Sequence, residues 1–144
     1  KIDMDSDAYW PIDKEGMEMG GGGMSLSLGD LARFGLLMLN DGLHNNQRIL
    51  PEGWVSEATT PDSSQVQPGK LYEDYPLGYQ YHWWTFPGDN QHAYEAQGIF
   101  GQFLYINPAE NIVIAMTSVW PVAWDDDKEI ETYALFHAIE EFLR

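Results

Sequence analysis

Three apolar segments in the second half of the chain constrain the fold most, because they lie close together and are joined by short polar turns. The segments are 78–86 (GYQYHWWTF), 94–107 (YEAQGIFGQFLYIN) and 111–119 (NIVIAMTSV), all rich in aromatic and β-branched residues. Connections of a few residues are too short for a crossover helix, so neighbouring strands must run antiparallel. We therefore predict an antiparallel sheet of about three strands.

Two helices are predicted before this sheet. Ser27 followed three residues later by Asp30 resembles a capping box, and apolar residues then recur at helical spacing, which predicts a helix over about 28–40. A proline near each boundary predicts a short helix over about 51–59. Residues 1–24 are loop-rich and end in four consecutive glycines, whose backbone freedom disfavours regular structure.

A third helix is predicted at the C-terminal end, over about 125–144. Acidic residues occupy its first turn, where they interact favourably with the helix dipole. We expect one apolar side of this helix to pack on the sheet. That side comprises Leu135, Phe136, Ile139, Phe142 and Leu143. The predicted fold class is α+β.

The composition narrows the range of partners and compartments. Seven basic against 23 acidic residues give a net charge of −16, which repels nucleic-acid phosphates, so nucleic acid is not an expected partner. No apolar run approaches the length of a membrane span, so a membrane is not expected either. The absence of cysteine fits cytoplasm and periplasm equally well. The first residues lack an initiator methionine, and we expect this start to be a cut inside a longer protein.

Neither a metal nor a cofactor is expected. Asp3, Asp5 and Asp7 imitate the first ligands of a calcium loop, but Ala8 and Lys14 stand where the turn glycine and the bidentate glutamate are needed. The four histidines are scattered, with no pair at zinc spacing. Both patterns are explained without a ligand, as a solvated acidic loop and as unrelated histidines.

The sequence offers aromatic residues for a pocket but no nucleophile. No serine is followed by lysine three residues later, and none lies in a Gly-x-Ser-x-Gly elbow. A row of aromatic residues could line a pocket for an apolar substrate or could be plain sheet core. The row consists of Tyr79, Tyr81, Trp83 and Trp84.

Taken in order, several segments resemble the C-terminal half of the serine β-lactamase-like hydrolases. These are GGGGMSLSLGDLARFGLLMLNDGLHNNQRILPEGWV, LGYQYHWW and AQGIFGQFLYINPAENIVIAMTS. The superfamily includes class C β-lactamases, DD-peptidases, family VIII esterases and 6-aminohexanoate-dimer hydrolase. The resemblance covers about residues 16–144 and implies a partial β-lactamase/transpeptidase-like fold, with 25–144 as the C-terminal portion of the hydrolase domain.

The resemblance also implies site residues. Ala96-Gln97-Gly98 holds the position of the family's third active-site motif, often Lys-Thr-Gly or His-x-Gly. Gly98 would let the acyl group approach the backbone, and the Ile99 N–H would be one oxyanion-hole donor. Gln97, Phe100, Tyr79 and Trp83 are the expected substrate contacts. From the residues alone, the two glycines of GIFGQ would equally fit a bulge in an ordinary strand.

Departures from the family pattern refine the expected activity. Ala96 replaces the usual cationic or imidazole residue, which argues against a penicillin-destroying enzyme and favours the esterase- or amidase-like branch. The family's Ser-x-x-Lys and Tyr-x-Asn motifs lie upstream of the matched region. Tyr105-Ile106-Asn107 matches the second by pattern only, and we interpret it as strand and turn.

The predicted function is therefore a C-terminal fragment of a serine hydrolase that cleaves amide or ester bonds through an acyl-enzyme. The fragment would supply a cleft wall and an oxyanion donor and would be inactive alone. Its expected partners are a small-molecule amide or ester substrate and the missing N-terminal part of a bacterial protein, in periplasm or cytoplasm. Apolar area left exposed by that missing part predicts self-association. The alternative is a non-catalytic binding or interaction module of the same fold.

Overall fold

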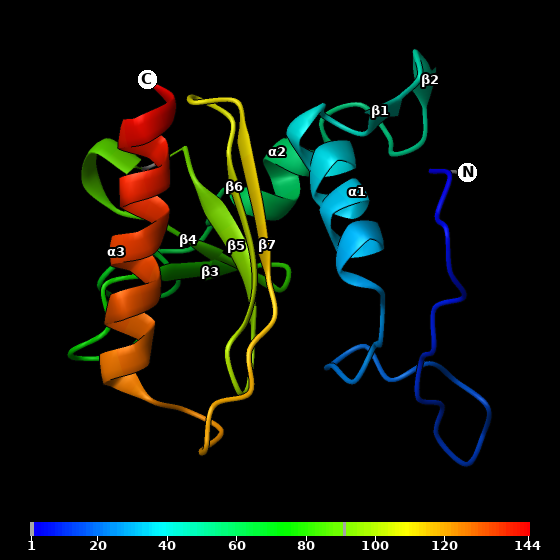
Figure 1. The fold of residues 1–144 in the computed structure, drawn as a ribbon, viewed down its shortest axis with the longest axis horizontal. Coiled ribbons are helices and arrows are strands. Elements are labelled where there is room, and N and C mark those ends of the chain that lie inside the picture. Colours follow the sequence, from blue (N-terminus) through cyan, green and yellow to red (C-terminus); the bar gives the residue numbers. More distant parts are fainter. Residues whose placement is uncertain (1, 91) are drawn as a thin grey trace.

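The computed structural model describes residues 2–90 and 92–144 and shows three layers in those ranges (Figure 1). An antiparallel sheet in the order β3-β4-β5-β6-β7 forms the middle layer. Helix α3 (Asp126–Leu143) covers one face, and α1 (Leu28–Leu39) with the short α2 (Trp54–Thr59) covers the other. This arrangement confirms the predicted α+β fold.

The sheet has five strands within the described ranges, because each of the first two predicted strands is a hairpin. The strands are β3 (Gly78–Gln80), β4 (Trp83–Thr85), β5 (Tyr94–Gly98), β6 (Gln102–Asn107) and β7 (Ile112–Met116). A 3₁₀ turn, η1 (Gly88–Asn90), lies between β4 and β5. A separate small hairpin pairs β1 (Leu43–His44) with β2 (Gln47–Arg48).

Both unpredicted turns place non-glycine residues in the left-handed region. Tyr81 and His82 turn the chain between β3 and β4 with φ values of 40° and 72°. Phe100 and Gly101 do the same between β5 and β6 with φ values of 62° and 83°. Aromatic residues rarely adopt this conformation, so Tyr81, His82 and Phe100 give no sequence signal for a turn, and Gly101 is the only residue of the two turns that does.

The α1 face of the sheet is apolar. Met38 from α1 packs with Leu104 and Ile106 from β6 in one buried cluster. Gly35 allows α1 to approach closely, because a Cβ there would lie 2.6 Å from Val113 Cγ1. Ser27 caps the helix by accepting the Asp30 N–H at 3.1 Å, as the capping box predicts. Helix α2 begins three residues later than the proline at position 51 indicates.

The α3 face differs from the prediction. The buried stripe of α3 consists of Glu129, Thr132, Phe136 and Glu140. Of the apolar side that was expected to pack on the sheet, only Phe136 is fully buried, whereas Leu135, Phe142 and Leu143 are exposed. The prediction was wrong because the buried acids find hydroxyl and amide donors on and beside the sheet, as described below.

The N-terminal segment runs outside α1, on the side away from the sheet (Figure 1). Isolated bridges, Tyr9 with Ser25 and Ile12 with Glu18, are its regular pairings among the described residues. Asp5 N–H donates to Asp30 Oδ1 at 2.8 Å and ties the segment to the start of α1. Its larger apolar side chains are exposed, among them Tyr9, Trp10, Ile12, Met17 and Met19. In the described ranges, none of the helices combines the length and apolar character that a membrane crossing requires.

Candidate active-site edge

The turn between β5 and β6 contains the exposed residue Ile99. Ile99 is 58% exposed, and its N–H donates no hydrogen bond to any residue that the structure describes. The next residue, by contrast, is held on both sides. Phe100 N–H donates to Ala123 O at 2.9 Å, and Phe100 O accepts from Trp120 N–H at 3.2 Å. The turn is therefore fixed to the segment after β7, and one amide remains available.

The two glycines that flank Ile99 and Phe100 have different structural roles. Gly101 lies in the left-handed region, and a Cβ there would lie 2.4 Å from the Trp120 ring, so the fold requires glycine. Gly98 is outside that region, and a Cβ would meet only the Gln102 side chain, at 3.1 Å. The described fold therefore gives only a weak reason for glycine at position 98.

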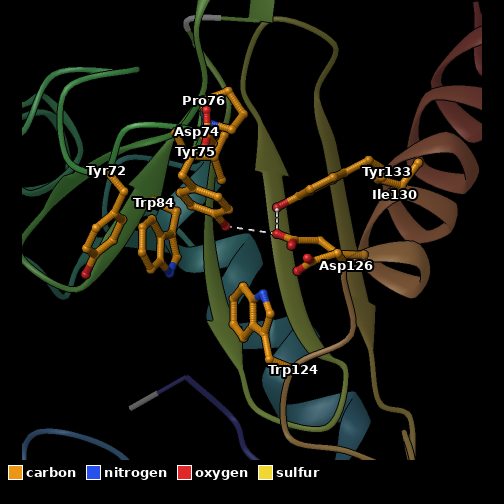
Figure 2. Close-up of a pocket in the computed structure, with 11 residues that line it drawn as sticks. Tyr72, Asp74, Tyr75, Pro76, Trp84, Trp124, Asp126, Ile130 and Tyr133 are labelled. Atoms are coloured by element: carbon orange, nitrogen blue, oxygen red, sulfur yellow. Dashed lines mark hydrogen bonds between the residues drawn. The ribbon is translucent and has the colours of Figure 1, made fainter.

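The end of β5 forms a free edge. Of the residues of β5, β4 pairs only with Tyr94 and Glu95, so 96–98 have no strand partner on that side within the described sheet. A cavity of about 730 Å³ lies beside this edge, between the loop before β3 and the first turns of α3 (Figure 2). It is lined by Tyr72, Asp74, Tyr75, Pro76, Leu77, Trp84, Trp124, Asp126, Glu129, Ile130 and Tyr133.

Aromatic rings form much of the cavity wall. The Tyr75 ring centroid lies 5.2 Å from that of Trp84 and 6.5 Å from that of Trp124, both in edge-on geometry. Tyr72 continues the row, 6.4 Å from Tyr75. Figure 2 shows Tyr75 and Tyr133 reaching toward the same point from opposite sides, with Trp124 at the lower end. Tyr79 contacts Trp84 at 4.7 Å but is not part of the lining.

A hydrogen-bond network joins the cavity to β5. Glu129, only 6% exposed, accepts at Oε1 from the Tyr75 hydroxyl at 2.9 Å, from Gln97 Nε2 at 2.8 Å and from the Tyr133 hydroxyl at 3.2 Å. Burial, together with the neighbouring carboxylates, raises the pKa of both tyrosines above the ordinary range, so both keep their protons as donors. Gln97 is thereby fixed one residue before Gly98.

A second carboxyl group lies deeper in the same network. Glu95 is fully buried, and its Oε1 lies 2.5 Å from the Tyr133 hydroxyl oxygen. Its Oε2 has no hydrogen-bond partner among the described residues. Burial raises the pKa of Glu95 to about 8, so this carboxyl group holds its proton at neutral pH.

The predicted site residues do not all lie at the end of β5, since Tyr79 and Trp83 belong to β3 and β4. Gln97, Gly98, Ile99 and Phe100 lie together at the end of β5, as their adjacency requires. Trp83 is buried in the α1-side core, where its ring stacks on Phe34 at a centroid distance of 6.2 Å, so it does not face the cavity. Tyr105 and Asn107 lie buried in β6, as the strand interpretation predicts, and both donate to Glu140.

The sequence analysis missed the cavity residues Tyr75, Trp124 and Glu129. Tyr75 belongs to a segment with the composition of a polar loop, and Trp124 precedes the last helix without a periodic pattern. A signal for Glu129 does exist, because positions 129, 132, 136 and 140 follow helical spacing and form one stripe. Only the polar character of that stripe hides it from a search for apolar faces.

Comparison with known proteins identifies the family of the chain. The sequence model of the Beta-lactamase family matches residues 2–138. The chain is 32% identical over 123 residues to a 6-aminohexanoate-dimer hydrolase of Paenarthrobacter ureafaciens, an alignment that covers 84% of this chain and 31% of the relative.

A solved Bacillus anthracis protein, described as a "Putative 6-aminohexanoate-dimer hydrolase", superposes with a TM-score of 0.79 at 28% identity, over 99% of this chain and 36% of its own. The chain thus spans about a third of the length of these relatives. From the family match and these two similarities, we conclude that the chain belongs to the Beta-lactamase family of serine β-lactamase-like hydrolases.

Proposed function

We propose that the chain is the C-terminal part of a serine hydrolase that cleaves amide or ester bonds through an acyl-enzyme. A serine and its proton-accepting partners, supplied from outside residues 1–144, would attack the carbonyl carbon and later release the acyl group to water. This chain would contribute the cleft wall at β5 and one hydrogen-bond donor to the developing oxyanion.

The observation that carries the proposal is the Ile99 N–H beside Gly98, which has no hydrogen-bond partner among the described residues. A donor stabilises an oxyanion best when it is already oriented and has no other partner. The contacts of Phe100 with Ala123 and Trp120 hold the turn and leave the neighbouring Ile99 amide unoccupied. The absence of a Cβ at position 98 gives an acyl group room beside the strand.

The substrate that we propose is a linear amide or ester. The names of the relatives refer to the 6-aminohexanoate dimer, and Ala96 offers no cationic partner for a carboxylate at the motif position. Gln97 and Phe100, on either side of the donor, are the proposed substrate contacts in this chain. Trp83 is not among the proposed substrate contacts, because its ring is buried in the core on the α1 side.

Replacing Gly98 in the full-length protein tests the proposal. A valine side chain at position 98 should crowd the acyl group and keep its carbonyl from the Ile99 N–H. Because loss of one oxyanion donor usually lowers kcat about a hundred- to a thousandfold, Gly98→Val should lower the turnover of p-nitrophenyl esters by about that factor. Gly98→Ala should give a smaller loss, and Ile99→Val, which keeps the amide, should change kcat little. Thermal melts of all three variants control for folding. Normal turnover in Gly98→Val with a normal melt would overturn the assignment of this edge.

Active-site labelling separates this proposal from its rival. A serine-directed fluorophosphonate should label one serine of the full-length protein outside residues 1–144, whereas the isolated 144-residue chain should show neither labelling nor an ester burst. Labelling of a serine within 1–144 would contradict the division of the site. Absence of both labelling and hydrolysis in the full-length protein would favour a non-catalytic binding module.

A further inference from the structure

The cavity beside β5 has a chemical character that hydrolysis alone does not require. We propose that it is a binding site for an organic ammonium group, with Glu129 as the anionic partner and the surrounding aromatic rings as the wall. The binding of a cation is argued from the residues of the cavity alone. Only the role of the cavity as part of a substrate site rests on the proposed function.

The charged side chains that line the cavity are all acidic. Asp74, Asp126 and Glu129 contribute carboxylates, and the described lining residues include no lysine, arginine or histidine. Such a wall repels anions and attracts cations, the more so in a chain of net charge −16.

Glu129 has one oxygen available to a ligand. Its Oε1 accepts from Tyr75 and Gln97 and lies 3.2 Å from the Tyr133 hydroxyl, whose single proton is shared with the nearer Glu95 Oε1. Its Oε2 has no hydrogen-bond partner among the described residues, although the residue is nine-tenths buried and lines the cavity. Glu129 Oε2 is not among the buried atoms that lack a partner, so it can be reached from the cavity, and a carboxylate oxygen with an unused lone pair is a strong acceptor for an N–H group of a cation.

The rings select an organic cation over a metal ion. Faces of tryptophan and tyrosine attract ammonium groups through their negative electrostatic potential, and Tyr72, Tyr75, Trp84 and Trp124 line the same cavity as this carboxylate. A calcium ion would instead need six or more oxygen ligands. The described residues contain no group of three or more His, Cys, Asp or Glu side chains placed to hold a metal ion.

Two segments of the chain link the cavity to the proposed oxyanion donor. Gln97, hydrogen-bonded to Glu129, is two residues before Ile99 and therefore about 7 Å away along the strand. Trp124 directly follows Ala123, whose carbonyl accepts the Phe100 N–H. A substrate whose carbonyl group is bound at Ile99 could thus place an ammonium-bearing arm in the cavity.

Binding of two matched probes to the full-length protein tests the proposal. Phenethylammonium should bind about tenfold more tightly than the uncharged 2-phenylethanol, as measured by calorimetry at pH 7. Glu129→Gln should weaken the binding of phenethylammonium by about tenfold and leave the affinity for 2-phenylethanol unchanged. Glu131→Gln, which removes the same charge from an exposed position of α3, should change neither value. Trp124→Ala, which removes a partly exposed ring, should weaken the binding of phenethylammonium several-fold.

Equal affinity for the two probes, no binding of either, or an equal effect of Glu129→Gln and Glu131→Gln would overturn the cation site. If Glu129→Gln unfolds the protein, Asp126→Asn at the exposed rim takes its place and should weaken only the cation. The substrate role has a separate readout, because Glu129→Gln should raise KM only for esters that carry an ammonium arm. A protein that binds the cation but hydrolyses no ester would refute the proposed function and leave the cation site intact.

Discussion

The two faces of the sheet are built from alternating residues of the same strands but differ in chemistry. Along β6, Leu104 and Ile106 point into the α1-side core, where the buried side chains are mostly apolar. Phe103, Tyr105 and Asn107 point toward α3, where Glu140 is buried with its hydrogen-bond donors. Glu95 and Glu129 lie on the α3 side as well.

This difference indicates which parts of the fold respond to protons and ligands. Apolar burial on the α1 side stabilises the fold by removing surface from water, and that contribution does not depend on protonation. Buried carboxyl groups on the α3 side stabilise only while each has its proton or its donors. The proposed oxyanion donor and the proposed cation site both lie at or beside the more polar side.

Truncation of an apolar core residue should produce the largest effect on stability. Leu104→Ala removes a fully buried side chain between α1 and the sheet and should lower the free energy of unfolding by about 3 kcal/mol. Urea denaturation of the purified protein at pH 5, 6.5 and 8 measures this. The difference from wild type should be the same at each pH. A difference that varies with pH would contradict the assignment of the α1 side as insensitive to protons.

Loss of a buried acceptor on the α3 side should have a smaller effect. Glu140→Ala leaves the Tyr105 hydroxyl and the Asn107 amide without their acceptor and should cost about 2 kcal/mol of unfolding free energy. Glu141→Ala, at an exposed position of the same helix, serves as the control and should change stability little. Equal stability of the two variants would show that the buried network contributes nothing.

The last predicted effect is a slope with pH rather than a single difference, and per pH unit it is the smallest of the three. The pKa of Glu95 is raised from 4.5 to about 8, so the folded protein keeps a proton that the unfolded chain releases. The favourable contribution is fully present below pH 4.5 and is lost as pH rises toward 8, at about 1 kcal/mol per pH unit.

Glu95→Gln, which keeps an acceptor for Tyr133 without a titrating proton, should flatten this slope between pH 5 and 8. The same urea series measures it, with Leu104→Ala as the variant that keeps the wild-type slope. Parallel curves for wild type and Glu95→Gln would refute the raised pKa.

The sequence predicted the three helices and the antiparallel sheet from local patterns. Ser27 and Asp30 identified the start of α1, and the acidic turn identified the start of α3, because helix caps are local interactions. The hairpins at Tyr81-His82 and Phe100-Gly101 were missed because tertiary contacts hold aromatic residues at positive φ there. One such contact is the Ala123 carbonyl that accepts the Phe100 N–H.

The candidate site was predictable only where it is contiguous in sequence. Gln97 to Phe100 lie together because they are neighbours in the chain, and the resemblance supplied their expected roles. Tyr75, Trp124 and Glu129 are separated by up to 54 residues and meet only when α3 packs on the sheet. No local sequence pattern predicts that these three residues line one cavity, so the cavity could be found only from the folded structure.

The hydrogen bonds that hold Phe100 make its turn suitable for study by hydrogen exchange. Two adjacent amides, Ile99 and Phe100, differ in that only the second is hydrogen-bonded to a described residue. In hydrogen exchange, the Phe100 amide should therefore report opening of the turn, whereas the Ile99 amide should report occupancy of the proposed oxyanion position. The protein thus carries a probe and its internal reference side by side, and a ligand that slows exchange at Ile99 alone can be distinguished from one that merely rigidifies the fold.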